Sequence, residues 1–323
     1  MTRILTFTEA ILEATEQEMR RNSKVLLLGL GVDDERGLQG TTKGLVDMFG
    51  DDRVVDTPLA EEGMTGIAIG MALSGLRIIH NHARMDFLLI AMNQVINIGA
   101  KAHYMYGGNV CIPIVIRVLI GDGWGAQHSQ GLHSLFAHIP GLKVVAPSTP
   151  YDAKGCLISS IRDNNPVIFI EHFNLYSQSG EVPEEIYTVP LGISKSVHSG
   201  DDITIIGVSW ATTMCLSSIK ILQQQNISAE IIDLLSVAPN NFDLLIESAI
   251  KTRRVLIVDC AWTSCGISAE IVSRIVEKVG NINIKFRRLG FAPVPSPNSK
   301  ILEEGFYPNP SIIAELALSM IKD

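Results

Sequence analysis

Ile112-Pro-Ile-Val-Ile-Arg-Val118 is a short, almost continuously apolar stretch that is rich in β-branched residues. A strand with one exposed face would alternate apolar and polar side chains, so this stretch is typical of a strand covered on both faces. Strands of this kind build the parallel sheets of α/β proteins. Four similar runs occur before and after it, at Val25–Leu28, Leu76–Ile79, Leu142–Ala146 and Val167–Ile170.

Helical patterns separate these runs. Asp86–Tyr106 and Tyr151–Arg162 are predicted helices, and Ile11, Leu12 and Met19 mark one side of an amphipathic helix near the N-terminus. This alternation of strands and helices predicts an α/β fold with a mainly parallel sheet flanked by helices.

A second α/β unit is predicted in the last third of the chain. Its predicted strands are 203–209, 229–235, 255–258 and 284–288, and its predicted helices are 211–225, 240–252, 267–279 and 311–320. Before it, residues 172–202 break the rhythm with serine, glycine and proline. We therefore predict a first domain over 1–185, a linker over 186–202 and a second domain over 203–323.

The composition describes a globular protein. Hydrophobic residues make up 46% of the chain, which is enough for real cores. The formal net charge of -8 argues against non-specific binding to nucleic acid or to anionic membranes. No apolar run approaches the roughly 18 residues that span a bilayer. The five cysteines lack CxxC spacing, so we expect reduced thiols in a cytoplasmic protein.

Familiar motifs for nucleotides and metals are incomplete. Gly29-Leu30-Gly31 begins like a dinucleotide fingerprint, but Asp34 stands where the third glycine belongs. His80 and His82 would point the same way on a strand, yet two ligands rarely make a zinc site. We interpret these histidines as surface or pocket imidazoles.

The densest unusual segment is Asp56-Thr-Pro-Leu-Ala-Glu-Glu-Gly-Met-Thr-Gly66. Thr57 suits a helix N-cap and Pro58 suits a first helical turn. Small residues that allow close backbone approach recur along one face of this helix, at Gly63, Gly66 and Gly70. The pattern predicts a packed interface that carries one carboxylate, Glu61. Taken alone, Glu61 is better explained as a stabilising acid in the first turn.

A second segment, Gly121-Asp-Gly-Trp-Gly-Ala-Gln-His-Ser-Gln-Gly131, follows the predicted strand 112–118. Ligand sites of open α/β sheets lie at the carboxyl ends of strands. His128 in this glycine-rich loop is therefore a candidate general acid or base, and a histidine that caps a helix is the alternative.

Together these segments resemble the beta subunit of the decarboxylating first component (E1) of 2-oxo acid dehydrogenases, a family with pyruvate, branched-chain and acetoin enzymes. The resemblance extends in order over nearly the whole chain. Its motifs are Thr-Lys-Gly-Leu at 42–45, Asp-Thr-Pro-Leu-Ala-Glu at 56–61, Ala-Leu-Ser-Gly-Leu-Arg at 72–77, Ala-Gln-His-Ser-Gln at 126–130, His-Ile-Pro-Gly-Leu-Lys-Val-Val-Ala-Pro-Ser-Thr-Pro-Tyr-Asp-Ala-Lys-Gly at 138–155 and Ile-Arg-Asp-Asn-Asn-Pro-Val-Ile at 161–168.

The resemblance implies a transketolase-like pyrimidine-binding domain followed by a transketolase C-terminal domain. It also implies an α2β2 heterotetramer with active sites at alpha–beta interfaces. The alpha-type chain would hold the diphosphate and Mg²⁺ of thiamine diphosphate, and this chain would hold the aminopyrimidine.

The same resemblance assigns roles to four residues. Glu61 matches the carboxylate that bonds the pyrimidine ring nitrogen and favours the imino tautomer, whose nitrogen removes the thiazolium proton. Phe87 matches an aromatic ring that lies against the pyrimidine, although it also suits an ordinary core position. Leu59 belongs to the same cofactor-binding set. His128 matches the active-site histidine that handles protons on the substrate or acyl carrier.

Metal sites follow less directly. Gly121-Asp122-Gly123 opens like the metal–diphosphate motif of thiamine enzymes, but residues 145–155 contain no asparagine as a second ligand, so another chain must bring that site. Some relatives bind a structural potassium ion, largely through backbone carbonyls, at the positions of Ser160, Asp163 and Asn165.

Several positions depart from the family pattern. Relatives often carry acids where this chain has Leu30, Asn81 and Asn93, and an arginine where it has Leu235. Those acids contribute to an acidic tunnel proposed to link two active sites. Leucine and asparagine cannot carry protons as carboxylates do. We therefore do not expect the two active sites of this protein to communicate through such a tunnel.

The segment His80–Asp86 is also more polar than in relatives. One interpretation is neutral sequence drift in a loop beside the interface. The other is a pocket for a polar or anionic substrate, with His82, Arg84 and Gln127 as candidate substrate residues.

Three functions remain open. The first is decarboxylation of a 2-oxo acid with acyl transfer to a lipoyl acyltransferase. The second is a free-standing thiamine enzyme that forms C–C bonds, for instance in making a branched sugar, and the lost acids favour it. The third is a silent assembly partner, against which Glu61, Phe87 and His128 argue together.

Overall fold

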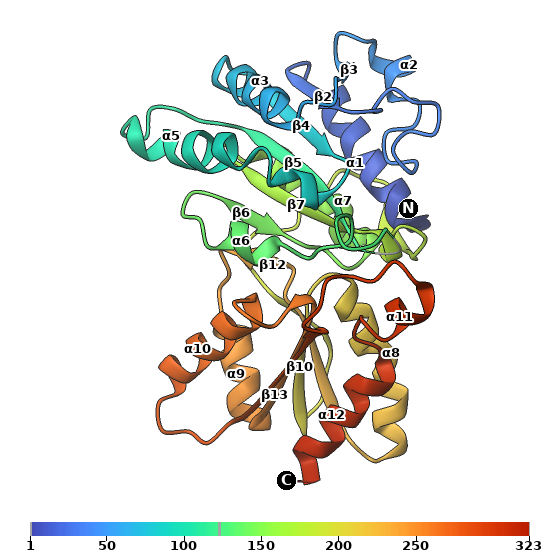
Figure 1. The fold of residues 1–323 in the computed structure, drawn as a ribbon, viewed down its shortest axis with the longest axis vertical. Helices are drawn as coiled ribbons and strands as arrows, with labels where there is room; N and C mark the ends of the chain where they lie inside the picture. Colours follow the sequence, from blue (N-terminus) through green and yellow to red (C-terminus); the bar gives the residue numbers. More distant parts are fainter. Residues whose placement is uncertain (1, 122–123, 323) are drawn as a thin grey trace. The chain divides into compact units, whose positions relative to one another are not determined.

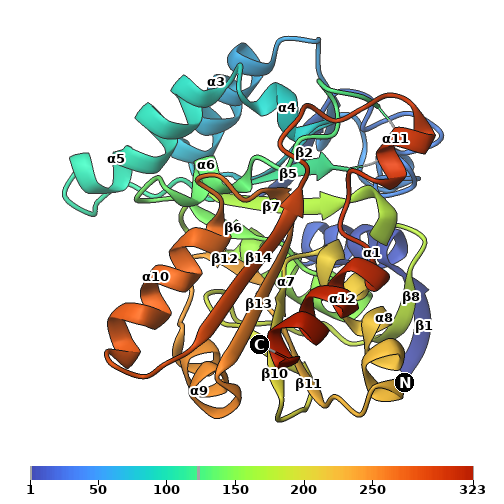
Figure 2. The same ribbon diagram turned by 60° about the horizontal axis from the view of Figure 1, so that its bottom comes forward.

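The computed structural model describes residues 2–121 and 124–322, which form two compact units. The first unit contains the chain up to Ile120 together with Leu135–Leu191. The second contains residues 124–134 and the chain from Gly192 onward. In each unit, helices cover both faces of a sheet, which confirms the predicted α/β class (Figures 1 and 2).

The sheet of the first unit has the strand order β6-β7-β5-β4-β2-β3, with neighbouring strands parallel. Its strands are β2 (Val25–Gly29), β3 (Val54–Asp56), β4 (Arg77–His82), β5 (Ile114–Ile120), β6 (Lys143–Val145) and β7 (Val167–His172). The side chains of β5 are buried except for Leu119, as its composition predicts. β5 begins after Pro113, which has no backbone N–H for the ladder.

Two helices cover one face of this sheet and three cover the other, and both views agree on this arrangement. The first pair is α1 (Phe7–Arg21) and α7 (Pro150–Arg162), and the others are α3 (Glu61–Leu73), α4 (Met85–Leu88) and α5 (Ala100–Met105) (Figures 1 and 2). The remaining elements are the antiparallel pair β1 (Thr2–Thr6) and β8 (Ser179–Pro183), α2 (Leu45–Phe49), α6 (His133–Ala137) and the 3-10 helix η2 (Phe173–Leu175).

The predicted helix 86–106 is interrupted. α4 ends at Leu88, and the π-helix η1 (Asn93–Gly99) leads into α5. A π-turn contains an extra residue compared with an α-turn, so it changes which side chains face the sheet. The apolar pattern of the sequence did not reveal this change. In the structure, η1 packs against α3.

The helix α3 begins at Glu61, so the predicted start at Thr57 and Pro58 was wrong. Ala60 is the N-cap residue and provides no side-chain hydrogen bond. The reason lies in β3, because the Asp56 carboxylate accepts a hydrogen bond from the Gly31 backbone N–H at 2.5 Å and holds the chain at the sheet. Residues 57–60 are then needed to reach the helix.

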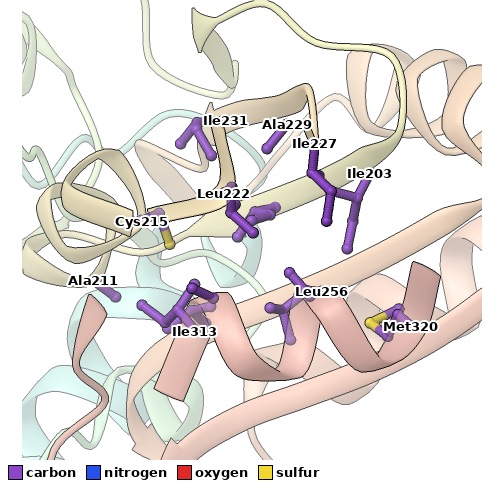
Figure 3. Packing of buried hydrophobic residues seen from close by; sticks show 14 of the residues in the cluster. Ile203, Ala211, Cys215, Leu222, Ile227, Ala229, Ile231, Leu256, Ile313 and Met320 are labelled. Carbon is purple, nitrogen blue, oxygen red and sulfur yellow. The ribbon is translucent and has the colours of Figure 1, made fainter. Parts of the chain in front are cut away.

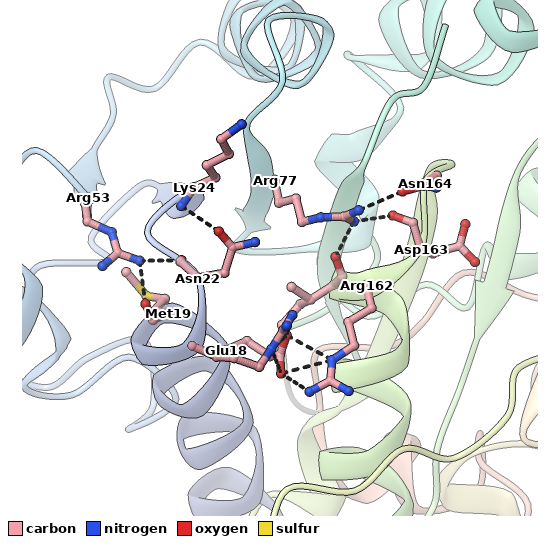
Figure 4. Close-up of polar contacts among 11 residues, drawn as sticks. Glu18, Met19, Asn22, Lys24, Arg53, Arg77, Arg162, Asp163 and Asn164 are labelled. Atoms are coloured by element: carbon pink, nitrogen blue, oxygen red, sulfur yellow. Dashed lines mark hydrogen bonds and ion pairs between the residues drawn. The ribbon is translucent and has the colours of Figure 1, made fainter. Parts of the chain in front are cut away.

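An ion pair between Glu18 and Arg162 joins α1 to α7 (Figure 4). Glu18 is buried and accepts hydrogen bonds from Arg162 at 2.6 Å and from Arg21 at 2.7 Å. Burial alone would raise the pKa of Glu18, but the two guanidinium groups outweigh it and lower that pKa. A carboxylate with two cationic partners is stabilised in its charged form, and its pair with Arg162 ties the two helices together.

The sheet of the second unit has the strand order β14-β13-β10-β11-β9. β9 is an antiparallel edge strand and the others are parallel. Its strands are β9 (Lys195–His198), β10 (Ile203–Gly207), β11 (Ala229–Asp233), β13 (Arg254–Trp262) and β14 (Lys285–Phe291). The predicted linker 186–202 therefore contains a strand of this sheet.

Helices also cover both faces of the second sheet (Figure 2). One pair is α8 (Trp210–Gln224) and α12 (Pro310–Lys322), and the other is α9 (Asp243–Thr252) and α10 (Ile267–Val279); β12 (Ser236–Ala238) and α11 (Lys300–Glu304) are short. The described helices include none that is long and apolar enough to cross a bilayer.

Apolar side chains from β10, β11, β13, α8 and α12 form the core between that sheet and the first helix pair (Figure 3). Cys215 and Leu222 of α8 lie against Leu256 of β13 and Ile313 of α12, and all four are fully buried. Burial of such side chains contributes about 1.5–3 kcal/mol each, which explains why α8 keeps its predicted apolar face.

Residues 124–134 group with the second unit, although the predicted boundaries include them in the first domain. A side chain at Gly131 would place its Cβ 2.1 Å from the carbonyl oxygen of Cys260 in β13. Only glycine allows two backbones to approach this closely. The segment is therefore packed directly on a strand of the second sheet.

Candidate active site

A pocket of about 140 Å³ lies in the first unit, where β2, β3 and β4 end. Ligand sites of parallel α/β sheets occur at these carboxyl ends. Its lining includes Leu30, Leu59, Glu61, Asn81, His82 and Phe87. A Cβ on Gly29 would lie 2.6 Å from the Asn81 carbonyl oxygen, so glycine is required where β2 meets β4 beside the pocket.

Glu61 lies in the first turn of α3 and lines this pocket half-buried. Among the residues that the structure describes, its carboxylate accepts no hydrogen bond and joins no ion pair. The positive end of the helix dipole stabilises a negative charge at this position. The carboxylate is thus available to a ligand that brings a hydrogen-bond donor.

Apolar side chains surround this carboxylate. Phe87 of α4 is half-buried, Met64 lies one turn along α3, and Leu59 is 74% exposed. One acceptor among apolar side chains suits a planar nitrogen heterocycle, which needs a stacking surface and a partner for its ring nitrogen. The residues present therefore fit the aminopyrimidine of thiamine diphosphate.

A hydrogen-bonded chain of His80, Thr65 and His82 forms another part of the wall. The Thr65 hydroxyl oxygen lies 3.1 Å from Nε2 of each histidine, and the rings meet edge to face with centroids 4.5 Å apart. Burial lowers the pKa of His80 to about 4, with partial opposition from the Leu28 backbone. Burial, and then the charge of His80, lowers the pKa of His82 well below its usual value. Both imidazoles are therefore neutral at neutral pH.

These histidines make stability depend on pH. The unfolded chain binds protons on His80 from about pH 6.5, whereas the folded chain binds one only near pH 4, so the free energy of unfolding falls as the pH falls between these values. Between pH 6.5 and 5 the expected loss is about 2 kcal/mol from His80, and His82 adds to it. Urea unfolding at both pH values measures this slope.

The matched control for that slope is the double variant His80→Val, His82→Phe. The variant should lose most of the pH dependence, while Glu18 still loses its contribution only below its usual pKa of 4.5. A slope that is the same in both proteins would contradict the assignment of neutral buried histidines.

Arg84, a predicted substrate residue, is buried just before α4. Burial and the nearby Glu171 charge raise the pKa of Tyr176 well above its usual value, and Arg117 and Arg84 oppose that rise. Arg84 therefore acts on a buried polar cluster in which Tyr176 donates to Glu171 at 2.8 Å. Its contact with a substrate stays a prediction.

The predicted residues Gln127 and His128 lie in the segment 124–134, which groups with the second unit. Gln127 is exposed and His128 is half-buried. Further along the segment, the buried His133 bonds the buried Asp259 carboxylate of β13 at 2.8 Å. The second unit therefore fixes the histidine loop, whereas the first unit holds Glu61, Leu59, Phe87 and His82 in one pocket.

The positions predicted for potassium lie at the end of α7 (Figure 4). The carbonyl oxygens of Ile161 and Asp163 accept hydrogen bonds from the Arg77 guanidinium at 3.0 and 2.9 Å. A side-chain cation thus already contacts part of this carbonyl cluster. A potassium ion at Ser160, Asp163 and Asn165 stays a prediction.

Within residues 2–121 and 124–322, no group of three His, Cys, Asp or Glu side chains could hold a metal ion. The motif Gly121-Asp122-Gly123 falls on two residues, Asp122 and Gly123, that lie outside the described ranges.

The positions that depart from the family pattern are scattered. Leu30 and Asn81 line the pocket, and Asn93 is exposed, with its amide 3.5 Å from Glu62. Leu235 is buried in the second unit with a φ of 54°.

The sequence predictions overlooked Thr65, although its spacing of four residues from Glu61 places both on one helix face.

Two family models match the chain, "Transketolase, pyrimidine binding domain" over residues 4–178 and "Transketolase, C-terminal domain" over residues 192–313. A solved structure titled "Split gene transketolase, inactive beta4 tetramer" has a TM-score of 0.79 at 18% identity and covers 98% of each chain. Fold and pocket together define a transketolase-like protein.

Two curated relatives are more similar in sequence. The beta subunit of acetoin:2,6-dichlorophenolindophenol oxidoreductase from Bacillus subtilis is 39% identical, over 99% of this chain and 98% of that protein. The pyruvate dehydrogenase E1 component subunit beta from Gracilaria tenuistipitata is 41% identical, over 99% of this chain and 100% of that protein. The chain therefore belongs to the family of 2-oxo acid dehydrogenase E1 component beta subunits, which confirms the resemblance in its motifs.

Proposed function

We propose that this chain is the cytoplasmic beta-type subunit of a thiamine-diphosphate enzyme that decarboxylates a 2-oxo acid and transfers the acyl group. The observation that carries the proposal is the pocket, in which the Glu61 carboxylate lies among apolar side chains without a partner from the described residues. When bound, thiamine diphosphate would supply the nucleophilic carbon that decarboxylation of a 2-oxo acid needs. Glu61 would bond the aminopyrimidine ring nitrogen, and Phe87 and Leu59 would support the ring.

An unpaired helix face supports the need for a second chain. A Cβ on Gly63 or Gly70 of α3 would meet nothing within 4 Å. Beside these glycines Ile67 is 52% exposed, and Leu59 at the pocket is 74% exposed. Apolar and small residues of this kind are typical of a surface that a partner covers. We assign this face to an alpha-type subunit, which would hold the diphosphate and Mg²⁺ in an α2β2 tetramer.

A free-standing enzyme that forms C–C bonds is the second candidate. Leu30 and Asn81 line the pocket where acids occur in relatives, and His82 adds a neutral polar group. These replacements favour an uncharged acceptor, such as an aldehyde or ketone, over the lipoyl domain of an acyltransferase.

Co-purification with the alpha-type chain tests the proposal. We expect the pair to bind thiamine diphosphate with Mg²⁺ about 100-fold more tightly than the single chain does, because the single chain lacks the charged contacts to the diphosphate. Calorimetry measures the affinity, and a screen of 2-oxo acids with and without aldehyde acceptors measures turnover.

A matched pair of surface variants tests the partner face. Ile67→Glu on α3 should prevent co-purification, whereas Ile4→Glu, at another exposed isoleucine on β1, should not. Turnover of a 2-oxo acid by the single chain would refute the proposed division of the site.

A further inference from the structure

We propose that His133 and Asp259 are positioning residues for His128. Their buried hydrogen bond sets the register of the segment 128–134 on β13 and thereby fixes the side of that segment on which the His128 imidazole is presented. The inference rests on the proposed function, because His128 is assigned to proton transfer in that reaction. Neither positioning residue is required to touch the substrate or the cofactor.

Burial alternates along the segment that leads from His128 to His133. Every second residue is buried, and the residues between them are half-buried; the buried set is Ser129, Gly131 and His133, and the half-buried set is His128, Gln130 and Leu132. A period of two is typical of a segment with one covered side. His128 and His133 are five residues apart, so they belong to opposite sides.

The covered side of the segment lies directly on β13. A Cβ on Gly131 would be 2.1 Å from the Cys260 carbonyl oxygen, so the two backbones are in contact there. Beside this contact, Nε2 of His133 lies 2.8 Å from Oδ2 of Asp259, and these residues are 1% and 3% exposed. Of the two contacts only the polar pair specifies a register, because a glycine fits against any stretch of backbone.

Stability does not explain why this pair is polar. Nδ1 of His133 and Oδ1 of Asp259 are both buried and have no hydrogen-bond partner among the described residues. Unpaired buried polar atoms cost free energy, and apolar side chains of similar size are often at least as stable in such positions. An apolar pair would, however, tolerate a shift of one residue. That shift would place Leu132 against the Asp259 carboxyl group and turn His128 toward the strand.

Two double variants separate register from stability in the full chain alone. His133→Leu with Asp259→Leu makes the pair apolar, and His133→Gln with Asp259→Asn keeps a hydrogen bond between neutral amides. Urea unfolding should show the apolar variant to be at least as stable as the wild type. Its backbone amides in 124–134 should exchange with deuterium about tenfold faster, because more than one register is populated, whereas the amide variant should exchange like the wild type.

Either of two results would overturn the inference at this stage. Wild-type exchange in the apolar variant would show that the pair does not set the register. A clear loss of stability in the same variant would show that the pair serves the core of the second unit.

Turnover of a 2-oxo acid by the complex with the alpha-type chain tests the link to His128. His128→Gln should lower kcat about 10²-fold. The apolar double variant should lower it about tenfold, as expected for a misplaced proton-transfer group, and the amide variant should recover most of that loss. In a His128→Gln background the apolar change should cost at most about twofold, because the group that it misplaces is already absent. A further tenfold loss there would overturn the inference.

Ile313→Val is the control for a general weakening of the second unit. Ile313 is fully buried in the core of that unit, so its variant should lose stability but keep the wild-type kcat. If the wild-type complex turns over no 2-oxo acid, the proposed function fails. Hydrogen exchange of the single chain then still decides whether His133 and Asp259 set the register.

Discussion

Glu61→Gln is expected to lower turnover of the alpha–beta pair by about 10³-fold, within the range for removing a general acid or base. Glutamine keeps the size of the side chain and can still bond a ring nitrogen. It cannot hold the negative charge that favours a proton on that nitrogen. Cofactor affinity should therefore change much less than the rate of proton loss from the thiazolium carbon, which hydrogen–deuterium exchange measures by NMR.

The neighbouring acid provides a matched control. Glu62 lies in the same first turn of α3 and is exposed, so Glu62→Gln removes the same charge from the same helix end. The exchange rate of this variant should stay within about twofold of the wild type, because the helix dipole is nearly unchanged. Wild-type exchange in Glu61→Gln would exclude the assigned role.

Glu171→Gln is expected to destabilise the first unit by about 3–5 kcal/mol, because it leaves a buried guanidinium without its counter-charge. Arg117 and Glu171 are each 1% exposed and make two hydrogen bonds, at 2.5 and 2.9 Å. Burial would lower the pKa of Arg117, but the Glu171 charge outweighs it and raises that pKa. Tyr176 donates to the same carboxylate at 2.8 Å.

A double variant distinguishes the loss of the whole ion pair from the cost of leaving one buried charge unpaired. Arg117→Met with Glu171→Leu replaces both charges by apolar groups of similar size, and such replacements are often close to neutral. Urea unfolding of both variants measures the effect. We expect the double variant to recover at least half of the free energy of unfolding that Glu171→Gln loses. A Glu171→Gln protein within about 1 kcal/mol of the wild type would show that the pair contributes little.

Much of the fold was predictable because the buried strands have a simple composition. The five apolar runs of the first unit all became parallel strands, since burial on both faces leaves little choice of residue. The start of α3 was not predictable, because it depends on a hydrogen bond between Asp56 and Gly31, which are far apart in sequence. The π-helix η1 was hidden for a similar reason, as its apolar residues also suit an α-helix.

The site was predicted in part. The family motifs identified Glu61, Leu59 and Phe87, and the structure brings them into one pocket. The hydrogen bonds between Thr65 and the two histidines, His80 and His82, were not predicted. They require α3 and β4 to lie close enough for their side chains to meet. The burial of Arg84 was likewise beyond the sequence, which shows a charge but not its surroundings.

The close approach of Gly131 to Cys260 has a consequence for how such a protein can be divided. The loop of His128 is inserted in the sequence of the first unit but depends on β13 for support. A fragment that ends at Leu191 would keep the acid assigned to activating the cofactor and lose the scaffold of the histidine. A cut at Leu191 therefore separates the segment of His128 from the strand that supports it, although the sequence suggests a domain boundary there.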